Sequence, residues 1–288
     1  FICILKACAN TGSLEIGEEL HAKVRERGLL KDNVELGNTL IDMYAKCGIL
    51  VRAEEIFNDL SQQDVVSWSA LIAGYAKSGL GDQAIKCLRQ MENKGVSPDE
   101  VTYVSVLKAC ATIGSLEIGK ELHAKVRERV LLKKNIVLGN TLIDMYAKCG
   151  LLTDAKDIFF EMNDVNVVTW TVMVAAYAEE DGLIALELFN KMEGHNFLKP
   201  NIVVFSSVLK ACGSIKATEK GTAIYAEIMR AVPLMETNVL VGAALINMYS
   251  KCDAIMKAQE IFDRLAFRNV VSSNALIAGY VQNELGEE

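Results

Sequence analysis

One segment of the chain occurs twice with an almost identical sequence, and this repetition restricts the possible folds more than any single residue does. Residues 12–27 recur at 114–129 and residues 37–48 recur at 139–150, each time 102 positions later. A Lys-Ala-Cys cluster shared by the two copies appears a third time at 210–212. A fixed period of this kind is typical of a linear stack of structural repeats with one continuous core.

The composition favours packed helices without a membrane span. Of the 288 residues, 51% are hydrophobic and only 3 are proline. Apolar stretches such as 239–249 reach about half of the ~20 residues that a transmembrane helix needs, so we expect no membrane association. The net charge of −7 disfavours a general polyanion-binding surface. Any contact with nucleic acid must therefore depend on where individual basic side chains lie.

Both ends of the chain fall inside a repeat. Phe1 aligns with Tyr103 of the next copy, and the last segment, from residue 270, stops before its repeat is complete. We therefore expect a piece of a longer protein, with any targeting segment or appended catalytic domain outside this sequence.

The sequence indicates no enzyme, cofactor or metal site. Six of the eight cysteines recur at the repeat spacing, and no Cys-x-x-Cys pair is present. We predict that they are small buried apolar residues in a reducing compartment. No nucleophile with a base, metal-ligand cluster, phosphate loop or dinucleotide fingerprint stands out. The six recurring cysteines are Cys8, Cys47, Cys110, Cys149, Cys212 and Cys252.

Within each long period the apolar residues have helical spacing. Leu142, Ile143, Met145 and Tyr146 fall on one helical face, and Gly150 follows where a helix end favours a left-handed residue. A second apolar stripe at helical spacing comes next, so the pattern is helix, short turn, helix. No stretch alternates as a strand would, and the fold class is predicted to be all-α.

The hairpins divide each period into three repeats of unequal length. A partial first repeat, 1–33, is followed by complete repeats and by a partial last one, 270–288. The complete repeats are 34–64, 65–99, 100–135, 136–166, 167–201, 202–238 and 239–269.

These hairpins resemble pentatricopeptide repeats of three kinds. Val65–Tyr75 resembles an ordinary repeat, Val106–Cys110 a long variant, and Gly139–Gly150 a short variant. Their order, long then short then ordinary, is similar to the PLS subclass. On that basis 1–33, 100–135 and 202–238 are long, 34–64, 136–166 and 239–269 are short, and 65–99, 167–201 and 270–288 are ordinary.

The resemblance implies a right-handed superhelical solenoid whose first helices bind single-stranded RNA, one base per repeat. A side chain on the first turn and the last residue of the repeat would read each base through their donors and acceptors. The implied readers are Asn38 with Asp64 for uridine, Ser69 with Asp99 for guanine, Asn140 with Asn166 for a pyrimidine, and Thr171 with Asn201 for adenine. Ser206 with Asn238 is adenine-like, and Asn274 is the reader of the last partial repeat. Ile2, Val104 and Ala243 offer no side-chain hydrogen bond, so the implied target is U-G-n-Y-A-n-n from 5′ to 3′.

Two further columns of residues follow from the resemblance. Apolar residues on successive repeats would sandwich the bases: Val66, Val101, Val137, Val168, Val203, Leu240 and Val271. Glu35 departs from that pattern. Lysines near the end of the first helices, Lys46, Lys77, Lys148 and Lys251, would meet phosphates, although a cation at a helix C-terminus would look the same. Glu179 replaces the lysine in the second ordinary repeat, which should weaken the groove there.

The resemblance implies an adaptor in RNA processing or editing in a mitochondrion or chloroplast. Its partners would be single-stranded RNA and the RNA-editing or processing proteins, and it gives no oligomeric state. The alternative is a helical-repeat scaffold that binds peptides, as the similar tetratricopeptide repeats do. A third reading makes the chain the recognition arm of a larger enzyme, but the deaminase motif such an enzyme needs is absent from this sequence.

Overall fold

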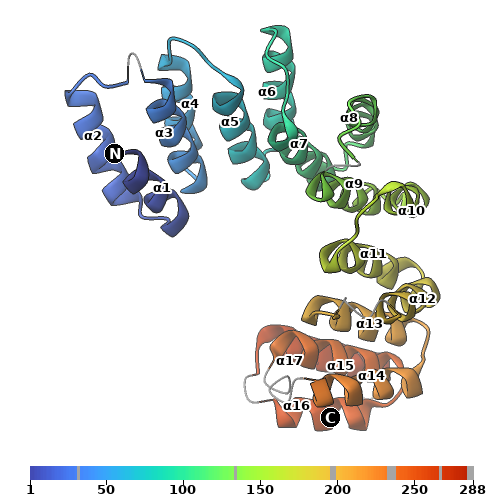
Figure 1. Cartoon of the computed structure of the whole chain (residues 1–288). Helices are drawn as coiled ribbons and strands as arrows, with labels where there is room; N and C mark the ends of the chain where they lie inside the picture. The colour runs from blue at the N-terminus through green and yellow to red at the C-terminus, as the bar shows by residue number, and fades with distance from the viewer. Residues whose placement is uncertain (31–32, 133–134, 195–198, 232–237, 266–267, 284–288) are drawn as a thin grey trace. The chain divides into compact units, whose positions relative to one another are not determined.

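The structure of the chain is a computed structural model that describes residues 1–30, 33–132, 135–194, 199–231, 238–265 and 268–283. Within these ranges every regular element is an α-helix, and the prediction of an all-α chain is confirmed (Figure 1). The chain divides into two compact halves, an N-terminal half (Phe1–Leu151) and a C-terminal half (Leu152–Glu288). Of the last partial repeat, residues 284–288 lie outside the described ranges.

In the N-terminal half the first helices of successive hairpins stack on one another. The first helices are α1 (Ile2–Thr11), α3 (Val34–Lys46), α5 (Val65–Lys77), α7 (Glu100–Ile113) and α9 (Ile136–Lys148). The second helices are α2 (Leu14–Glu26), α4 (Leu50–Asp59), α6 (Gly81–Asn93) and α8 (Leu116–Glu128). Each first helix contacts the next first helix, and each second helix packs against its own first helix and the one that follows. The first helices therefore form a continuous layer within this half.

The C-terminal half repeats this arrangement. Its first helices are α11 (Val167–Glu180), α13 (Ile202–Ser214), α15 (Val239–Lys251) and α17 (Val270–Gln282). Its second helices are α10 (Leu152–Glu161), α12 (Gly182–Glu193), α14 (Thr218–Ala231) and α16 (Ile255–Arg264). Here too each first helix contacts the first helix that follows. In the ranges that the structure describes, no helix combines the length and the apolar character needed to cross a lipid bilayer.

Aromatic residues fill the space between consecutive hairpins. Trp68 on α5 is 2% exposed and meets Phe57 of α4 edge-on, with ring centroids 4.6 Å apart. Trp170 on α11 meets Phe159 of α10 in the same way, at 4.9 Å. Both tryptophans are thus core residues, because an edge-to-face contact of this kind adds to the apolar area that they bury.

The recurring cysteines are free thiols inside the stack. Cys8, Cys110 and Cys212 are buried, whereas Cys47, Cys149 and Cys252 are half-buried. Burial raises the pKa of the Cys110 thiol to about 12 and that of Cys212 to about 11. Buried thiols that stay protonated are inert, which agrees with the predicted packing role.

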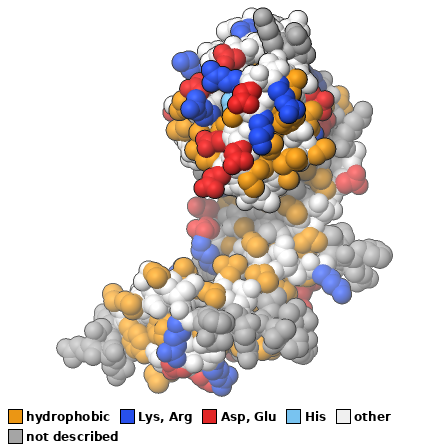
Figure 2. Space-filling model, turned by 90° about the vertical axis from the view of Figure 1, so that its left-hand side faces the viewer, with side chains coloured by type: hydrophobic (Ala, Val, Ile, Leu, Met, Phe, Trp, Pro, Cys, Tyr) orange, Lys and Arg blue, Asp and Glu red, His pale blue; other side chains and the backbone are white. Residues whose placement is uncertain are grey.

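A network of four charges joins the second helices α6 and α8. Arg89 bonds to both carboxylate oxygens of Glu121, and Lys125 lies 2.7 Å from Glu92 and 2.9 Å from Glu121. Hydrogen bonds from Arg89 and Lys125 lower the pKa of Glu121 to about 2. On the face of the N-terminal half seen in Figure 2, basic and acidic side chains are likewise interspersed. Ion pairs within single helices, such as Arg52 with Glu55, add to the pairs that join α6 and α8.

The equivalent network is missing from the C-terminal half. Glu193 of α12 takes the place of Glu92, and Glu227 of α14 takes the place of Lys125. Burial and the neighbouring Glu227 raise the pKa of Glu193 to about 6, against the weaker attraction of Lys220. Two carboxylates thus neighbour each other where the first copy has an ion pair, and Glu193 keeps its proton to a higher pH than an isolated glutamate does.

We expect Glu227→Lys to raise the melting temperature at pH 7 by about 1–3 °C, because it restores the ion pair seen between Lys125 and Glu92. In the parent chain the folded state binds the Glu193 proton more tightly than the unfolded chain does. This contribution to stability is present at pH 4.5 and is lost as the pH rises through 6. The variant should lose that pH dependence in thermal melts. Equal melting curves for the two proteins between pH 4.5 and 7 would contradict the assignment.

Candidate functional site

The residue before every first helix except α1 is an Asn or Asp that caps the helix. From α3 onwards these residues are Asn33, Asp64, Asp99, Asn135, Asn166, Asn201, Asn238 and Asn269. In each case the side-chain Oδ1 accepts a hydrogen bond from a backbone N–H of the first turn. Capping alone therefore favours Asn or Asp at this position. It occupies only Oδ1, which leaves Oδ2 or Nδ2 for another partner.

Asn38 and Asp64 are joined across two hairpins. Asn38, the fifth residue of α3, is 7% exposed and donates from Nδ2 to Asp64 Oδ1 at 3.0 Å. The Ser67 hydroxyl lies 2.6 Å from Asn38 Oδ1, and the Ser67 amide donates to Asp64 Oδ1 at 2.9 Å. Burial raises the pKa of Asp64, but the hydrogen bonds from Ser67 and Asn38 together outweigh it and leave the pKa below its ordinary value. Asp64 is therefore a carboxylate that only accepts hydrogen bonds.

The next predicted pair has the same arrangement. The Ser69 hydroxyl donates to Asp99 Oδ1 at 3.1 Å and lies 2.6 Å from the hydroxyl of Thr102. Thr102 also donates its backbone N–H to Asp99 Oδ1 at 2.8 Å. A small polar residue three positions into each helix thus holds both members of the pair in place.

In the C-terminal half one predicted pair meets and another does not. Asn201 donates from Nδ2 to the Thr171 hydroxyl at 3.1 Å. The Ser206 hydroxyl donates to the Val203 carbonyl, and no hydrogen bond in the described ranges joins it to Asn238. The repeat 202–238 therefore shows the fifth residue and the cap apart.

For the two remaining predicted readers, Asn140 and Asn274, the structure is described without a pairing. Asn140 belongs to the N-terminal half, is 9% exposed, and its Oδ1 has no hydrogen-bond partner among the described residues. Its predicted partner Asn166 belongs to the C-terminal half and caps α11. Asn274 is the exposed fifth residue of α17.

The seven apolar residues predicted to sandwich bases are all exposed. Each is the second residue of a first helix, and each has 45–60% of its surface accessible. They are Val66, Val101, Val137, Val168, Val203, Leu240 and Val271. Because second and fifth residues lie on one helical face, each exposed apolar side chain stands beside the reader position of its repeat, which Val104 and Ala243 occupy in two of them. Glu35 occupies this position on α3 and is also exposed.

The four predicted phosphate lysines differ in their partners. Lys46 lies 2.7 Å from Asp42, and Lys148 lies 2.8 Å from Asp144, each within one helix. Lys77 donates to the backbone carbonyl of Lys46 at 3.3 Å, which is a helix-end contact. Lys251 makes no hydrogen bond or ion pair with any described residue. The aspartates four positions before Lys46 and Lys148 are visible in the sequence and would have predicted this difference.

A cleft of about 390 Å³ lies between the first helices of the C-terminal half. It contains the predicted residues Ser206, Leu240 and Val271, and small residues make up much of the remaining wall. Glu179 and Lys210, which also line it, form an ion pair. The polar residues of the cleft that the sequence did not predict are Ser207, Lys210 and Asn247.

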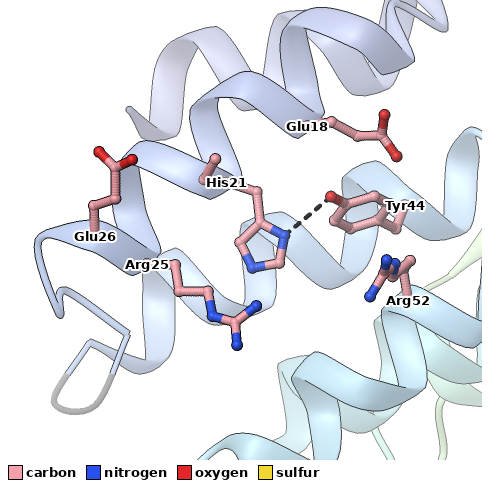
Figure 3. A pocket seen from close by; sticks show the side chains of 7 residues that line it. Glu18, His21, Arg25, Glu26, Tyr44 and Arg52 are labelled. Atoms are coloured by element: carbon pink, nitrogen blue, oxygen red, sulfur yellow. Dashed lines mark hydrogen bonds between the residues drawn. The ribbon is translucent and has the colours of Figure 1, made fainter.

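A second cavity, of about 480 Å³, lies on the side of the second helices (Figure 3). In this cavity His21 Nδ1 lies 3.0 Å from the Tyr44 hydroxyl. At the equivalent place in the second copy, His123 Nδ1 lies 2.9 Å from the Tyr146 hydroxyl. Burial, and then the charges of Arg25 and Arg52, lower the pKa of His21. A histidine that pairs with the equivalent tyrosine in both copies fits the predicted structural role.

Models of known protein families match two long stretches of the chain. The PPR repeat family matches residues 63–112, the PPR repeat matches 38–65 and 140–167, and the pentatricopeptide repeat domain matches 164–214. Together these matches cover residues 38–112 and 140–214, which is just over half of the chain.

Relatives with the same repeats match almost the whole chain. The chloroplastic pentatricopeptide repeat-containing protein At4g18520 of Arabidopsis thaliana is 35% identical over 97% of this chain and 45% of its own length. The mitochondrial protein At3g09040 of the same plant is 34% identical over 99% of this chain and 27% of its own length. The chain thus spans less than half the length of these relatives.

Solved structures share the fold. The pentatricopeptide repeat protein PPR10 in complex with an 18-nt psaJ RNA element superimposes with a TM-score of 0.79, at 20% identity, over 95% of this chain and 41% of that one. PPR10 from maize superimposes with a TM-score of 0.76. The predicted solenoid of helical hairpins is therefore confirmed, and the chain belongs to the pentatricopeptide repeat family.

Proposed function

We propose that the chain binds single-stranded RNA in a sequence-selective way along its first helices, with one base per repeat. The observation that carries this proposal is a group of residues that recurs at the start of several first helices. In α5, α9, α11, α13 and α17 a polar fifth residue follows an exposed apolar second residue, and in three repeats the fifth residue is hydrogen-bonded to the next cap. An apolar surface suits the face of a base, and paired donors and acceptors suit its edge.

The finer assignments are part of the same proposal. The order of long, short and ordinary repeats supports the PLS subclass, and the paired residues support the base preferences of the readers. Relatives named chloroplastic or mitochondrial support an organellar location. We propose that the chain serves there as an adaptor for RNA-processing or RNA-editing proteins, without catalysis of its own.

The test is binding of a labelled RNA that carries U-G-n-Y-A-n-n, with a scrambled RNA and the corresponding DNA as controls. We expect the matched RNA to bind most tightly. Its binding constant should fall as salt rises, with a logarithmic slope of about −0.7 for each phosphate contacted. Equal binding of all three nucleic acids would contradict sequence-selective recognition of RNA.

Two lysine variants then locate the phosphate contacts. Lys77→Ala should reduce the slope by about 0.7, because this ammonium carries no carboxylate partner. Lys46→Ala should change it less, because Asp42 already neutralises that lysine. A slope that does not respond to either change would remove the lysine column from the interface.

A further inference from the structure

The three repeats predicted to be short can be compared along the same side of their first helices. The third repeat differs there from the other two. Along one side of the first helix lie the fifth, ninth and thirteenth residues, which succeed one another at intervals of one turn. In the first two copies the ninth residue is an aspartate that pairs with the thirteenth, a lysine. These residues are Asn38, Asp42 and Lys46 in the first copy, Asn140, Asp144 and Lys148 in the second, and Ala243, Asn247 and Lys251 in the third.

Two changes coincide in the third copy. Ala243 removes the polar side chain at the reader position, and Asn247 replaces the carboxylate that would neutralise Lys251. The stem of Lys251 passes close to Gly213, since a Cβ on that glycine would lie 3.5 Å from Lys251 Cδ. The lysine is therefore supported by α13 while its ammonium is free of any described partner.

Asn247 faces the cleft with its hydrogen-bonding groups unused. Ala243 and Asn247 both line the cleft of about 390 Å³, together with Leu240 and Val271. Asn247 is half-buried and makes no hydrogen bond to any described residue. Its amide offers a donor and an acceptor side by side, which is the pattern that pairs with two adjacent atoms of a base edge.

We propose that Asn247 determines base specificity at the repeat 239–269, reached across the space that Ala243 leaves, and that Lys251 contacts the accompanying phosphate. A base lying against Leu240 and Val271 meets no side-chain donor at Ala243 and meets the amide one turn further along α15. This inference rests on the proposed binding of RNA. Under this proposal the repeat 239–269, whose fifth residue is Ala243, selects its base through its ninth residue, Asn247, one helical turn further along.

The experiment selects bound sequences from a random RNA pool with the parent chain, with Asn247→Ala and with Ala243→Asn. The last variant marks the nucleotide that faces this repeat, because it places an amide at the position used in the other two copies. We expect the parent chain to show at least a threefold base preference at that nucleotide. Asn247→Ala should abolish that preference and leave the preferences at the other nucleotides unchanged.

Matched changes in the second copy serve as controls. Asp144→Ala occupies the same position beside Asn140 and should leave the preference at its nucleotide intact. Lys251→Ala should reduce the salt slope by about 0.7, whereas Lys148→Ala should reduce it less, because Asp144 already pairs with Lys148.

The results separate this inference from the proposed function. If the parent chain selects no RNA sequence at any position, the proposed function fails. If it selects RNA but Asn247→Ala leaves the marked nucleotide unchanged, or that nucleotide shows no preference in the parent chain, the role of Asn247 is overturned while RNA binding stands.

Discussion

Replacing Asn38 by threonine is expected to move the preference at one nucleotide from uridine towards guanine by about tenfold or more. In the parent chain Asn38 donates an amide N–H to Asp64. A threonine there offers a hydroxyl beside the same carboxylate, which reproduces the pairing of Ser69 with Asp99 in the following repeat. Selection from a random RNA pool measures the change directly.

The reciprocal variant provides the control for this prediction. Ser69→Asn should move the adjacent nucleotide from guanine towards uridine and leave the first nucleotide unchanged. The cap at Asp64 or Asp99 is kept in both variants, so the helices should remain intact and circular dichroism should be unaltered. An unchanged base profile in both variants would show that these pairs only cap and pack.

Removal of the Trp68 side chain is expected to lower the free energy of unfolding by about 3–5 kcal/mol. The indole is 2% exposed, meets Phe57 edge-on, and lies under the ammonium of Lys94 at 5.4 Å. Because each repeat contacts only its neighbours, the loss should fall on the junction of α4 with α5 and split the unfolding into separate steps. Urea titration followed by circular dichroism tests both expectations.

Phe160→Ala is the matched control, since it deletes another aromatic ring from a similar hairpin. Phe160 is 65% exposed, so we expect a loss of about 1 kcal/mol or less. Comparable losses for Trp68→Ala and Phe160→Ala would mean that Trp68 is not part of the core between these hairpins.

Local sequence signals predicted the helices well because their causes act within a turn or two. Apolar spacing places Leu142, Ile143 and Met145 inside the stack, and all three are fully buried. Gly150 follows the helix with φ +77°, the left-handed conformation expected after a helix end. The Asn and Asp caps are likewise local, because each bonds to an amide two or three residues ahead.

The candidate site was predictable in outline only. The resemblance to pentatricopeptide repeats identified the fifth residues, the last residues of the repeats and the apolar column, and the structure places the last residues as caps at the start of the next first helix. The resemblance did not identify Asn247. In the aligned copies Asn247 stands where the other two have Asp42 and Asp144, and this difference could have pointed to it. Comparison of the copies also shows Glu227 where Lys125 stands, but its effect on Glu193 becomes visible only when α12 and α14 are placed.

The sequence alone determined the helical hairpins and their period, because the periodicity of apolar residues depends on neighbours along the chain. Tertiary structure decided which side chains meet between hairpins. It brought Asn38 to Asp64 and Asn201 to Thr171, and it opened the cleft beside Asn247. The physical reason is that a hydrogen bond needs its atoms within about 3 Å, a distance set by the packing of one helix on another and not by spacing along the sequence.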